Sequence, residues 1–317
     1  MILITGGMGF IGLHTARAFL DAGEDVVLTH FKTRREPDFI KDALGTRARV
    51  ESLDVADASA VQAVVARHAV HGIVHLAVPG LGALTPADEY RTNTQGLLNV
   101  LEAGRQAGVR RVTIASSIAV YWGLDHGPLR EDDRLPLPST SPTEAFKKAE
   151  EVLGQHYADR TGLDVVYGRL GLIYGPLYHS MANLPSRLTH AAVRGTRPDF
   201  TGMREAPLAD DAADLCYVKD CARGVQLLHQ ADRERLKHRV YNIGGGRAVT
   251  NAELAAAVNK AVPEADVRLE PGRSARGGRQ DAYMDLTRAG EDLGYEPAFS
   301  VDQAIADYAS WLRSNPQ

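Results

Sequence analysis

The chain has 317 residues, of which 44% are hydrophobic and 24% are charged, and its formal net charge is −4. This composition is typical of a globular protein, and the length predicts two coupled lobes. Because both charge signs are interspersed without a basic stripe, nucleic acid and anionic membranes are poor partners, and a small molecule is favoured. No apolar run is long enough for a membrane span, and an apolar run starts at Met1, so we expect a cytoplasmic protein without a signal peptide. Cys216 and Cys221 are expected to be buried thiols, and no metal site is expected.

The first twelve residues carry the clearest motif of the chain. The apolar residues 1–4 precede Thr5-Gly6-Gly7-Met8-Gly9-Phe10-Ile11-Gly12, and an amphipathic pattern follows as far as Gly23. This order predicts a strand, a tight turn and a helix. Glycines at positions 6, 9 and 12 let the backbone approach a pyrophosphate, while the helix N-terminus supplies free N–H groups and the positive end of a dipole. The context therefore favours a dinucleotide site over a glycine-rich turn that binds nothing.

Short β-rich runs and helical stretches alternate through the first half of the chain. We expect strands at 26–28, 49–53, 72–77, 111–116 and 163–170, and helices at 58–68 and 94–107. Asp57 and Gly108 stand where a helix N-cap and a helix stop are expected. Such alternation predicts an α/β fold with a doubly wound parallel sheet whose ligand lies at the carboxyl ends of the strands. Residues 128–142 are interpreted as a surface loop across this edge, and a second, smaller lobe is expected beyond Pro176.

The residues after the second and third expected strands bear on the choice of cofactor. The second strand ends Leu28-Thr29-His30, without the carboxylate that binds a ribose 2′-hydroxyl, and Lys32, Arg34 and Arg35 follow it. Arginine at this place accommodates a 2′-phosphate, so NADP is favoured over NAD, with a solvated basic loop as the alternative. Asp54 ends the third strand, where a carboxylate accepts a hydrogen bond from an adenine amino group or caps a turn.

Taken together, these motifs resemble the extended short-chain dehydrogenase/reductase family, in its NAD-dependent epimerase/dehydratase group. Besides the glycine motif, the resemblance rests on residues 93–103, on Ala115-Ser116-Ser117 with Val120-Tyr121, on Tyr174-Gly175-Pro176, and on residues 217–220, 241–244 and 285–297. It implies an NAD(P)-binding Rossmann domain of residues 1–175, to which 215–258 return, a substrate lobe of 176–214 and 259–317, and a homodimer built on helices of the cofactor lobe. The cofactor contacts that it implies are Gly6, Gly9, Phe10, Ile11, Gly12, His30, Lys32, Arg34, Arg35, Asp54, Val55, Leu76, Ala77, Asn93, Ser116 and Lys147.

The catalytic tyrosine of that family is missing from this chain. Family members place a tyrosine four residues before a lysine, which lowers the pKa of the phenol so that it can carry a proton while hydride moves. Aligning Ser141-Pro142 and Lys147 puts Thr143 in this position, and no tyrosine of the chain has a lysine four residues later. A threonine hydroxyl is a weaker acid and is shorter by a ring. Ser117 and Lys147 are still expected to contact a substrate oxygen and the nicotinamide ribose, the alternative being a turn serine and a surface lysine.

Two further departures from the family concern the substrate. Its nucleotide-sugar members hold the diphosphate with an asparagine three residues after an arginine and with an arginine before an aspartate. Here Leu172 follows Arg169 at that spacing, and Ala213 precedes Asp214. Apolar groups supply no charge-assisted hydrogen bond to a diphosphate, so a small non-nucleotide carbonyl, hydroxyl or acid substrate is favoured. The cluster of Arg273, Arg276 and Arg279 is interpreted as a solvated loop rather than an anion site.

A replacement for the missing acid is expected in the loops over the strand ends. Tyr178 and His179 rank ahead of Asp125 and His126, because the segment after the domain junction lines the substrate cleft in similar proteins; an ordinary loop role is the alternative for each. Two functions remain open. The first is an enzyme with bound NADP or NAD and an altered proton-transfer arrangement, of oxidoreductase, epimerase or non-redox lyase type. The second is a catalytically degenerate protein that uses its dinucleotide site for sensing or regulation.

Overall fold

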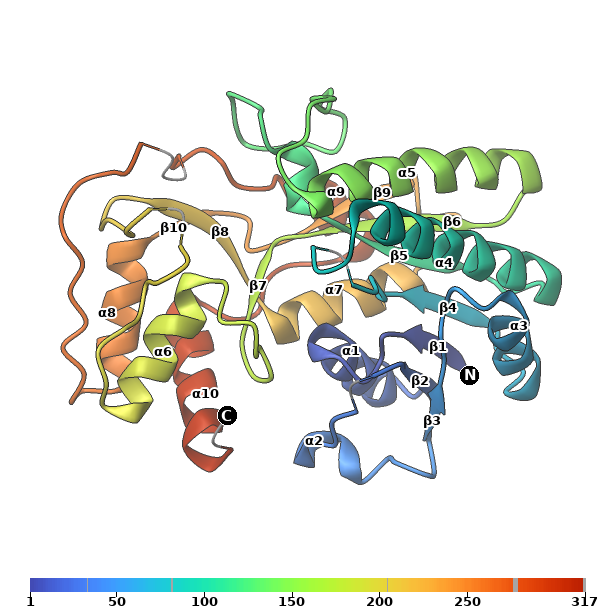
Figure 1. Cartoon of the computed structure of the whole chain (residues 1–317), viewed down its shortest axis with the longest axis horizontal. Coiled ribbons are helices and arrows are strands. Elements are labelled where there is room, and N and C mark those ends of the chain that lie inside the picture. Colours follow the sequence, from blue (N-terminus) through green and yellow to red (C-terminus); the bar gives the residue numbers. More distant parts are fainter. Residues whose placement is uncertain (33, 81, 204, 276–278, 316–317) are drawn as a thin grey trace.

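The computed structural model describes residues 1–32, 34–80, 82–203, 205–275 and 279–315. In this part of the chain a parallel seven-stranded sheet dominates the fold (Figure 1). The strand order is β3 (Ala48–Ser52), β2 (Val26–His30), β1 (Ile2–Thr5), β4 (Gly72–His75), β5 (Val112–Ser117), β6 (Val165–Leu170) and β9 (Val240–Ile243). The order reverses direction between β1 and β4, which is where a doubly wound sheet binds its ligand. The predicted fold class is confirmed.

Helices cover both faces of this sheet, and each face has its own apolar core. On one face lie α1 (Phe10–Asp21) and α7 (Val218–Gln230), which pack against each other; on the other lie α3 (Ala58–Arg67), α4 (Pro86–Ala107) and α5 (Pro142–Thr161). All four residues of β1 are buried, which explains why this strand is a continuous apolar run rather than an alternating one. The short helix α2 (Asp38–Lys41) follows β2 and contacts α1.

Helix boundaries follow local capping chemistry. The Asp57 side chain accepts a hydrogen bond from the Ala60 N–H at 3.0 Å at the start of α3, and Gly108 ends α4 in the left-handed region at φ +63°, both as predicted. Helix α4 begins at Pro86 rather than at residue 94. Thr85 supplies its N-cap, and a proline in the first turn is pre-organised for a helix start.

The smaller lobe contains a three-stranded sheet and three helices. Its strands are β10 (Ala248–Thr250), β8 (Ala212–Tyr217) and β7 (Leu172–Tyr174). The helices α6 (Leu184–Arg194), α8 (Asn251–Ala261) and α10 (Val301–Ser314) pack on one another around Leu188, Leu254 and Ile305. Helix α8 therefore lies with the second lobe, although the expected boundary at residue 258 placed most of it with the cofactor lobe. Conversely, α9 (Thr287–Leu293) packs against β9 of the large sheet.

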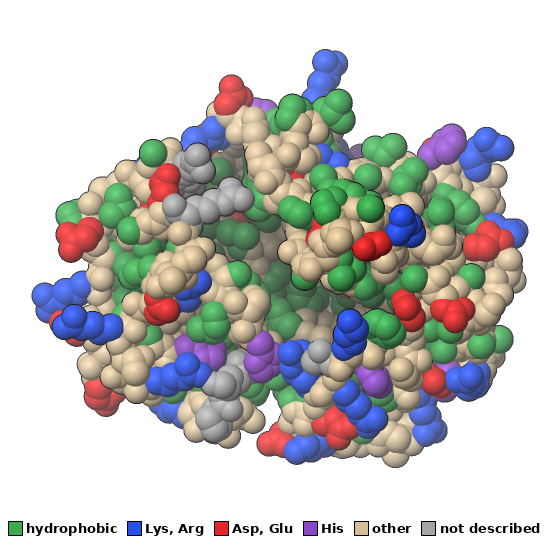
Figure 2. Space-filling model, viewed as in Figure 1, with side chains coloured by type: hydrophobic (Ala, Val, Ile, Leu, Met, Phe, Trp, Pro, Cys, Tyr) green, Lys and Arg blue, Asp and Glu red, His purple; other side chains and the backbone are tan. Residues whose placement is uncertain are grey.

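The two lobes enclose a hollow with hydrophobic side chains at its floor, which Figure 2 shows in the middle of the face it presents. The long loop between the 3₁₀ helix η1 (Ile118–Tyr121) and α5 projects at the top of the view in Figure 1. Cys216 and Cys221 are buried and free, as predicted. Among the described residues, no helix combines the length and the apolar character needed to cross a bilayer.

Candidate functional site

The glycine turn after β1 has the shape that the sequence predicts. Gly6 has a φ of +67°, and a Cβ there would lie 3.2 Å from the backbone of Ala77. A side chain at Gly12 would collide with the backbone of Gly6 and Gly7, so this glycine lets α1 pack directly onto the turn. The first N–H groups of a helix have no partner within the helix. The turn and α1 together therefore fit a phosphate group, both in shape and in charge.

A groove of about 450 Å³ opens beside this turn, and we call it the glycine-loop groove. Seven of the predicted cofactor contacts line it: Gly6, Gly9, His30, Lys32, Asp54, Val55 and Ala77. The remaining wall is formed by Thr29, Phe31, Leu53, Val78, Pro79, Gly80, Leu84 and Thr92. One carboxylate oxygen of Asp54 accepts a hydrogen bond from the Ala56 N–H at 2.9 Å, so its turn role is present. The groove extends from the glycine turn to the ends of β2 and β3, as an extended dinucleotide requires.

Some predicted contacts support the groove from behind rather than line it. The Asn93 amide donates to the carbonyl oxygens of Pro79 at 3.0 Å and Glu89 at 2.8 Å, and so holds the groove wall onto α4. The Leu76 N–H donates to the Thr5 hydroxyl at 3.2 Å. That hydroxyl is also 2.7 Å from Nδ1 of the buried His75, which ties the ends of β1 and β4 together.

The three basic residues after β2 have different environments. Lys32 lines the groove, with its ammonium 5.7 Å from the centre of the Phe31 ring. Arg34 is instead paired with Glu36, at 2.7 Å from Nε to Oε1, and is not among the groove residues. Burial lowers the pKa of Arg35, whose charge in turn helps to lower the pKa of His179. The predicted cluster is therefore divided, and only Lys32 faces the groove.

Two of the predicted catalytic residues lie at the start of α5. Thr143 is in the first turn of the helix and is exposed to solvent. Lys147 lies one turn further along and is buried, with its ammonium 2.7 Å from Oε2 of Glu150. Thus Lys147 is not a surface lysine, and its charge is engaged inside the protein. Glu150 was not predicted as a site residue, although its position three residues after Lys147 in a helix is a readable signal.

The two serines at the end of β5 face different partners. The Ser117 Oγ accepts a hydrogen bond from the Ala119 N–H at 3.1 Å and caps η1. The Ser116 hydroxyl donates to Glu151, which also binds Arg169 through two hydrogen bonds of 2.7 and 3.0 Å. Ser116 is therefore directed at α5 in this structure, which differs from its expected contact with the cofactor.

A second cavity, the interlobe cleft, has a volume of about 710 Å³ and lies between η1, the loop before α5, β7 and β8. Its wall is largely apolar, from Ile118, Tyr121, Trp122, Gly123, Leu124, Leu129, Pro136, Pro138, Leu172, Ala212, Ala213 and Ala282. The polar lining residues are His126, Thr140, Glu144, Asp214 and Arg279. Leu172 and Ala213, the two positions where the sequence departs from the diphosphate-binding residues of the family pattern, therefore both face this cleft. Of the clustered arginines, Arg276 lies outside the described residues.

Two cleft residues have pKa values that are raised above their ordinary values. A hydrogen bond to Asp133, with 3.3 Å between Nε2 and Oδ1, and a weaker contact with Asp125 raise the pKa of His126. Burial raises the pKa of Asp214 to about 6, although the N–H groups of Gly245 and Met284 donate to its carboxylate. Both oxygens of Asp214 are therefore held by backbone N–H groups, whereas the His126 ring contacts only the carboxylates of Asp125 and Asp133.

Tyr178 and His179 lie elsewhere. Leu177 adopts a φ of +73°, and the chain then turns over the start of α1, where the Tyr178 ring packs edge-on against Phe10 at 5.1 Å. His179 is exposed, and burial and the charge of Arg35 lower its pKa. Neither residue lines the interlobe cleft, so their predicted rank above His126 is not supported by their location.

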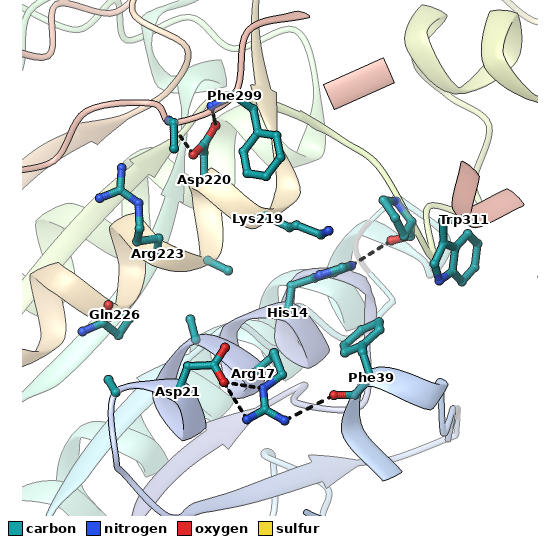
Figure 3. A pocket seen from close by; sticks show the side chains of 15 residues that line it. His14, Arg17, Asp21, Phe39, Lys219, Asp220, Arg223, Gln226, Phe299 and Trp311 are labelled. Atoms are coloured by element: carbon teal, nitrogen blue, oxygen red, sulfur yellow. Dashed lines mark hydrogen bonds and ion pairs between the residues drawn. The ribbon is translucent and has the colours of Figure 1, made fainter. Parts of the chain in front are cut away.

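A third cavity of about 680 Å³ runs between α1 and α7 (Figure 3). His14 lies at its centre, and Figure 3 shows Lys219 and Arg223 of α7 on one side and Arg17 of α1 on the other. Arg17 is engaged by Asp21, with 2.9 Å between Nε and Oδ1. Phe39, Phe299 and Trp311 complete the wall, so both lobes contribute to it. No residue predicted for catalysis or cofactor binding lines this cavity.

Known proteins share the sequence pattern and the fold of this chain. A family model described as the NAD dependent epimerase/dehydratase family matches residues 2–244. The chain is 30% identical to dTDP-glucose 4,6-dehydratase of Streptomyces griseus, over 99% of this chain and 94% of that protein. UDP-glucose 4-epimerase of Thermotoga maritima, solved with UDP-glucose, superimposes with a TM-score of 0.82 at 23% identity, covering 100% of this chain and 99% of that one. A partial consensus L-threonine 3-dehydrogenase superimposes with a TM-score of 0.74 at 26% identity, covering 99% of each chain.

Proposed function

The chain belongs to the NAD-dependent epimerase/dehydratase family, and we propose that it is an NADP-preferring enzyme acting on a compact, non-nucleotide carbonyl, hydroxyl or acid substrate. The family resemblance stated from the sequence is thereby confirmed. The relatives are enzymes, and the glycine turn with its groove fits a dinucleotide. The nicotinamide, when bound, supplies hydride exchange, and the roles of the protein's own residues form the rest of the proposal.

The preference for NADP rests on Lys32 and on the absence of a carboxylate at the end of β2. His30 ends that strand and lines the glycine-loop groove beside Lys32. A carboxylate at this place would accept hydrogen bonds from a free ribose and would repel a 2′-phosphate. A lysine ammonium, by contrast, is a good partner for phosphate. Arg35 does not line the groove, so the proposal does not depend on its charge.

The observation that carries the substrate proposal is the pair of apolar side chains, Leu172 and Ala213, on the wall of the interlobe cleft. A nucleotide-sugar carries a diphosphate with two negative charges, which must be offset by donors or cations where it is buried. Two apolar positions leave the cleft without such groups at those points, and the arginine that lines it, Arg279, is already paired with Asp281 at 2.8 Å. The relative named L-threonine 3-dehydrogenase supports this proposal, because a protein of this fold can have an amino acid as its substrate.

For proton transfer we assign His126 the role that the missing phenol has in the family. Its imidazole faces the cleft and is held by Asp133, an arrangement that orients the ring and raises the pKa. In this assignment His126 protonates the substrate oxygen as the carbonyl is reduced, or removes the proton as the hydroxyl is oxidised. Thr143, exposed at the start of α5, takes no part in the transfer.

The second candidate function, dinucleotide sensing without catalysis, is favoured by Thr143 alone. One experiment separates the two: purification of the protein with its bound dinucleotide, followed by incubation with small ketones, aldehydes, hydroxy acids and, for comparison, UDP-glucose. Conversion of the dinucleotide between its redox states by a small substrate supports the enzyme. Binding of dinucleotide with no turnover of any substrate supports the sensor, and turnover of UDP-glucose alone contradicts the substrate proposal.

We also propose a homodimer that pairs α4 and α5 with their copies. These helices lie side by side (Figure 1) and expose Leu98, Val152 and Leu153. Val152 is 69% exposed and lies on α5. A second copy of the same helix pair would cover these side chains.

A further inference from the structure

Lys147 and Glu150 form an ion pair inside the cofactor lobe. Oε2 of Glu150 accepts a hydrogen bond of 2.7 Å from the Lys147 ammonium, and the carboxylate side chain is 0% exposed while that of Lys147 is 8% exposed. The second oxygen, Oε1, is also buried and has no hydrogen-bond partner among the described residues. The half-satisfied carboxylate therefore depends on Lys147 for its charge balance.

The other buried charged groups near Glu150 are bound to one another, so Lys147 is its partner. The neighbouring carboxylate, Glu151, is already bound by Arg169 and Ser116, and this arginine makes no hydrogen bond to Glu150. A buried carboxylate that loses its cation is costly, since desolvation is no longer offset. Such a pair is seldom more stable than apolar residues of similar size, so stability alone does not explain it.

The position of the pair suggests what it does. Lys147 is the residue expected to contact the nicotinamide ribose, and its charge helps to lower the pKa of His75 at the end of β4, next to the glycine turn. A lysine with a phenol four residues before it serves to lower the phenol pKa, and a carboxylate bound to that lysine would weaken this effect. With Thr143 in place of a phenol, that constraint is absent. An ion pair between Glu150 and Lys147 is thus compatible with a threonine at position 143.

We propose that Glu150 is a positioning residue that holds the Lys147 ammonium in place and neutralises its charge, so that Lys147 serves dinucleotide binding rather than acid–base catalysis. This inference rests on the proposed dinucleotide function. An ammonium has three N–H donors, so Lys147 can keep its bond to Glu150 and donate to ribose hydroxyls with the others. The oxidised nicotinamide ring is positively charged and the reduced ring is neutral. The carboxylate of Glu150 therefore matters more for the oxidised form.

The first experiment measures the dissociation constants of NADP⁺ and NADPH for the wild type and for Glu150→Gln. We expect the variant to weaken NADP⁺ relative to NADPH by about tenfold, since an uncompensated lysine repels only the oxidised ring. Equal changes for both forms, which loss of structure alone would produce, overturn the inference. Asp292→Asn is the matched control, because it neutralises another buried carboxylate paired with a lysine, Lys237, at 2.9 Å. Asp292 lies in α9, which packs on β9 at the edge of the sheet opposite the groove. This control should leave the ratio of the NADP⁺ and NADPH dissociation constants unchanged. Failure of the wild type to bind either form would instead refute the proposed function.

The second experiment needs no dinucleotide and introduces a phenol as a reporter of the lysine's charge. Thr143→Tyr is titrated by the ultraviolet absorbance of tyrosinate, with the wild type as the background. With Glu150 present, we expect the introduced phenol to titrate no lower than the ordinary value of about 10. In Thr143→Tyr combined with Glu150→Gln, it should titrate about one unit lower. A low phenol pKa in the single variant overturns the inference even if the double variant does not fold.

Discussion

The imidazole of His14 in α1 donates a hydrogen bond from Nε2 to the carbonyl oxygen of Pro176, at 3.1 Å and across 162 residues of chain. Because a carbonyl only accepts, Nε2 carries the hydrogen, and the bond requires no positive charge. The ring also stacks on Phe39, with 4.8 Å between ring centres. This single side chain connects the helix of the glycine turn to the junction between the lobes. Burial lowers the pKa of His14 to about 4, so it is neutral in the folded protein at neutral pH.

The buried histidines predict that the protein is destabilised by mild acid. Burial also lowers the pKa values of His75 and His229 to about 3, whereas an unfolded histidine titrates near 6.5. Below about pH 6.5 the unfolded chain takes up protons that the folded chain does not bind. Each of these histidines therefore lowers the free energy of unfolding by about 1.4 kcal/mol per pH unit, from pH 6.5 downward until its folded pKa is reached. Urea denaturation between pH 8 and pH 5 measures this slope.

Asp214 acts in the opposite direction in part of the same range. Its folded pKa of about 6 lies above the unfolded value of about 3.9, so its protonation favours the folded state as the pH falls through 6. Burial lowers the pKa of a fourth histidine, His190, to about 4 as well, and four histidines outweigh Asp214, so the free energy of unfolding should still fall. His14→Phe should reduce the slope by about one proton, at a cost to the junction with Pro176. A free energy of unfolding that stays constant from pH 8 to pH 5 contradicts the assignment of neutral buried histidines.

Gly9→Val should abolish dinucleotide binding and leave the fold in place. Gly9 is the N-cap of α1 and lines the glycine-loop groove, where a β-branched side chain would fill the space of the pyrophosphate. Calorimetry with NADP and NAD, together with circular dichroism, measures both effects. Gly290→Ala is a suitable control, because a Cβ at this position meets no atom closer than 3.8 Å. Unchanged dinucleotide affinity in Gly9→Val would mean that the cofactor binds elsewhere.

Lys32→Ala should weaken NADP by about tenfold or more and leave NAD nearly unchanged, because it removes a charged hydrogen bond to the 2′-phosphate. Arg34→Ala is the matched control, since Arg34 is already paired with Glu36 outside the groove. It should change neither affinity by more than about twofold. The comparison is made by fluorescence titration with both dinucleotides. Equal losses for NADP and NAD in Lys32→Ala would exclude the 2′-phosphate role.

The parts of the fold that follow from local pattern were predictable. The apolar run of β1, the glycine turn and the caps at Asp57 and Gly108 all depend on neighbouring residues. The early start of α4 could also have been predicted, because Thr85 followed by Pro86 is a typical helix start. It was missed because the first turns of the helix are polar and lack an apolar periodic pattern. The lobe to which α8 belongs could not be predicted, because the helices it packs against, α6 and α10, are distant in sequence.

The candidate site was predictable where residues follow directly after a strand of the parallel sheet. It was less predictable where the path of the chain depends on a turn that no local pattern specifies. The groove contacts at His30, Lys32 and Asp54 follow from strand ends in a parallel sheet. Beyond Pro176, by contrast, the left-handed Leu177 redirects the chain towards Phe10, and no local pattern specifies that turn. Sequence reasoning also missed the partner of Lys147, because the burial of a helix face is decided by tertiary packing.

Val152→Glu should convert the proposed dimer into monomers. A charged side chain at position 152 of α5 cannot be covered by a second copy without losing its hydration. Leu137→Glu is the control, because Leu137 is 91% exposed but lies in the loop before α5 rather than on the helix surface. Analytical ultracentrifugation of both variants and of the wild type measures the effect. A wild type that is monomeric at micromolar concentration would remove the basis for this interface.

The last prediction compares His126 with His179 as the source of the proton. If His126 is the acid that faces the cleft, His126→Gln should reduce turnover of the natural substrate by about 10²–10⁴-fold with little change in dinucleotide affinity. His179→Gln should have a small effect, because His179 lies by Arg35 and does not line the cleft. The pH profile distinguishes loss of an acid from loss of structure, since the limb that reports the raised pKa of His126 should disappear from the variant's residual activity. Thr143→Tyr should not rescue His126→Gln while Glu150 neutralises Lys147. The reverse result would be a severe loss of turnover in His179→Gln with turnover unaffected in His126→Gln. It would mean that the proton donor lies in the segment after the junction, and that this segment moves towards the cleft when substrate binds.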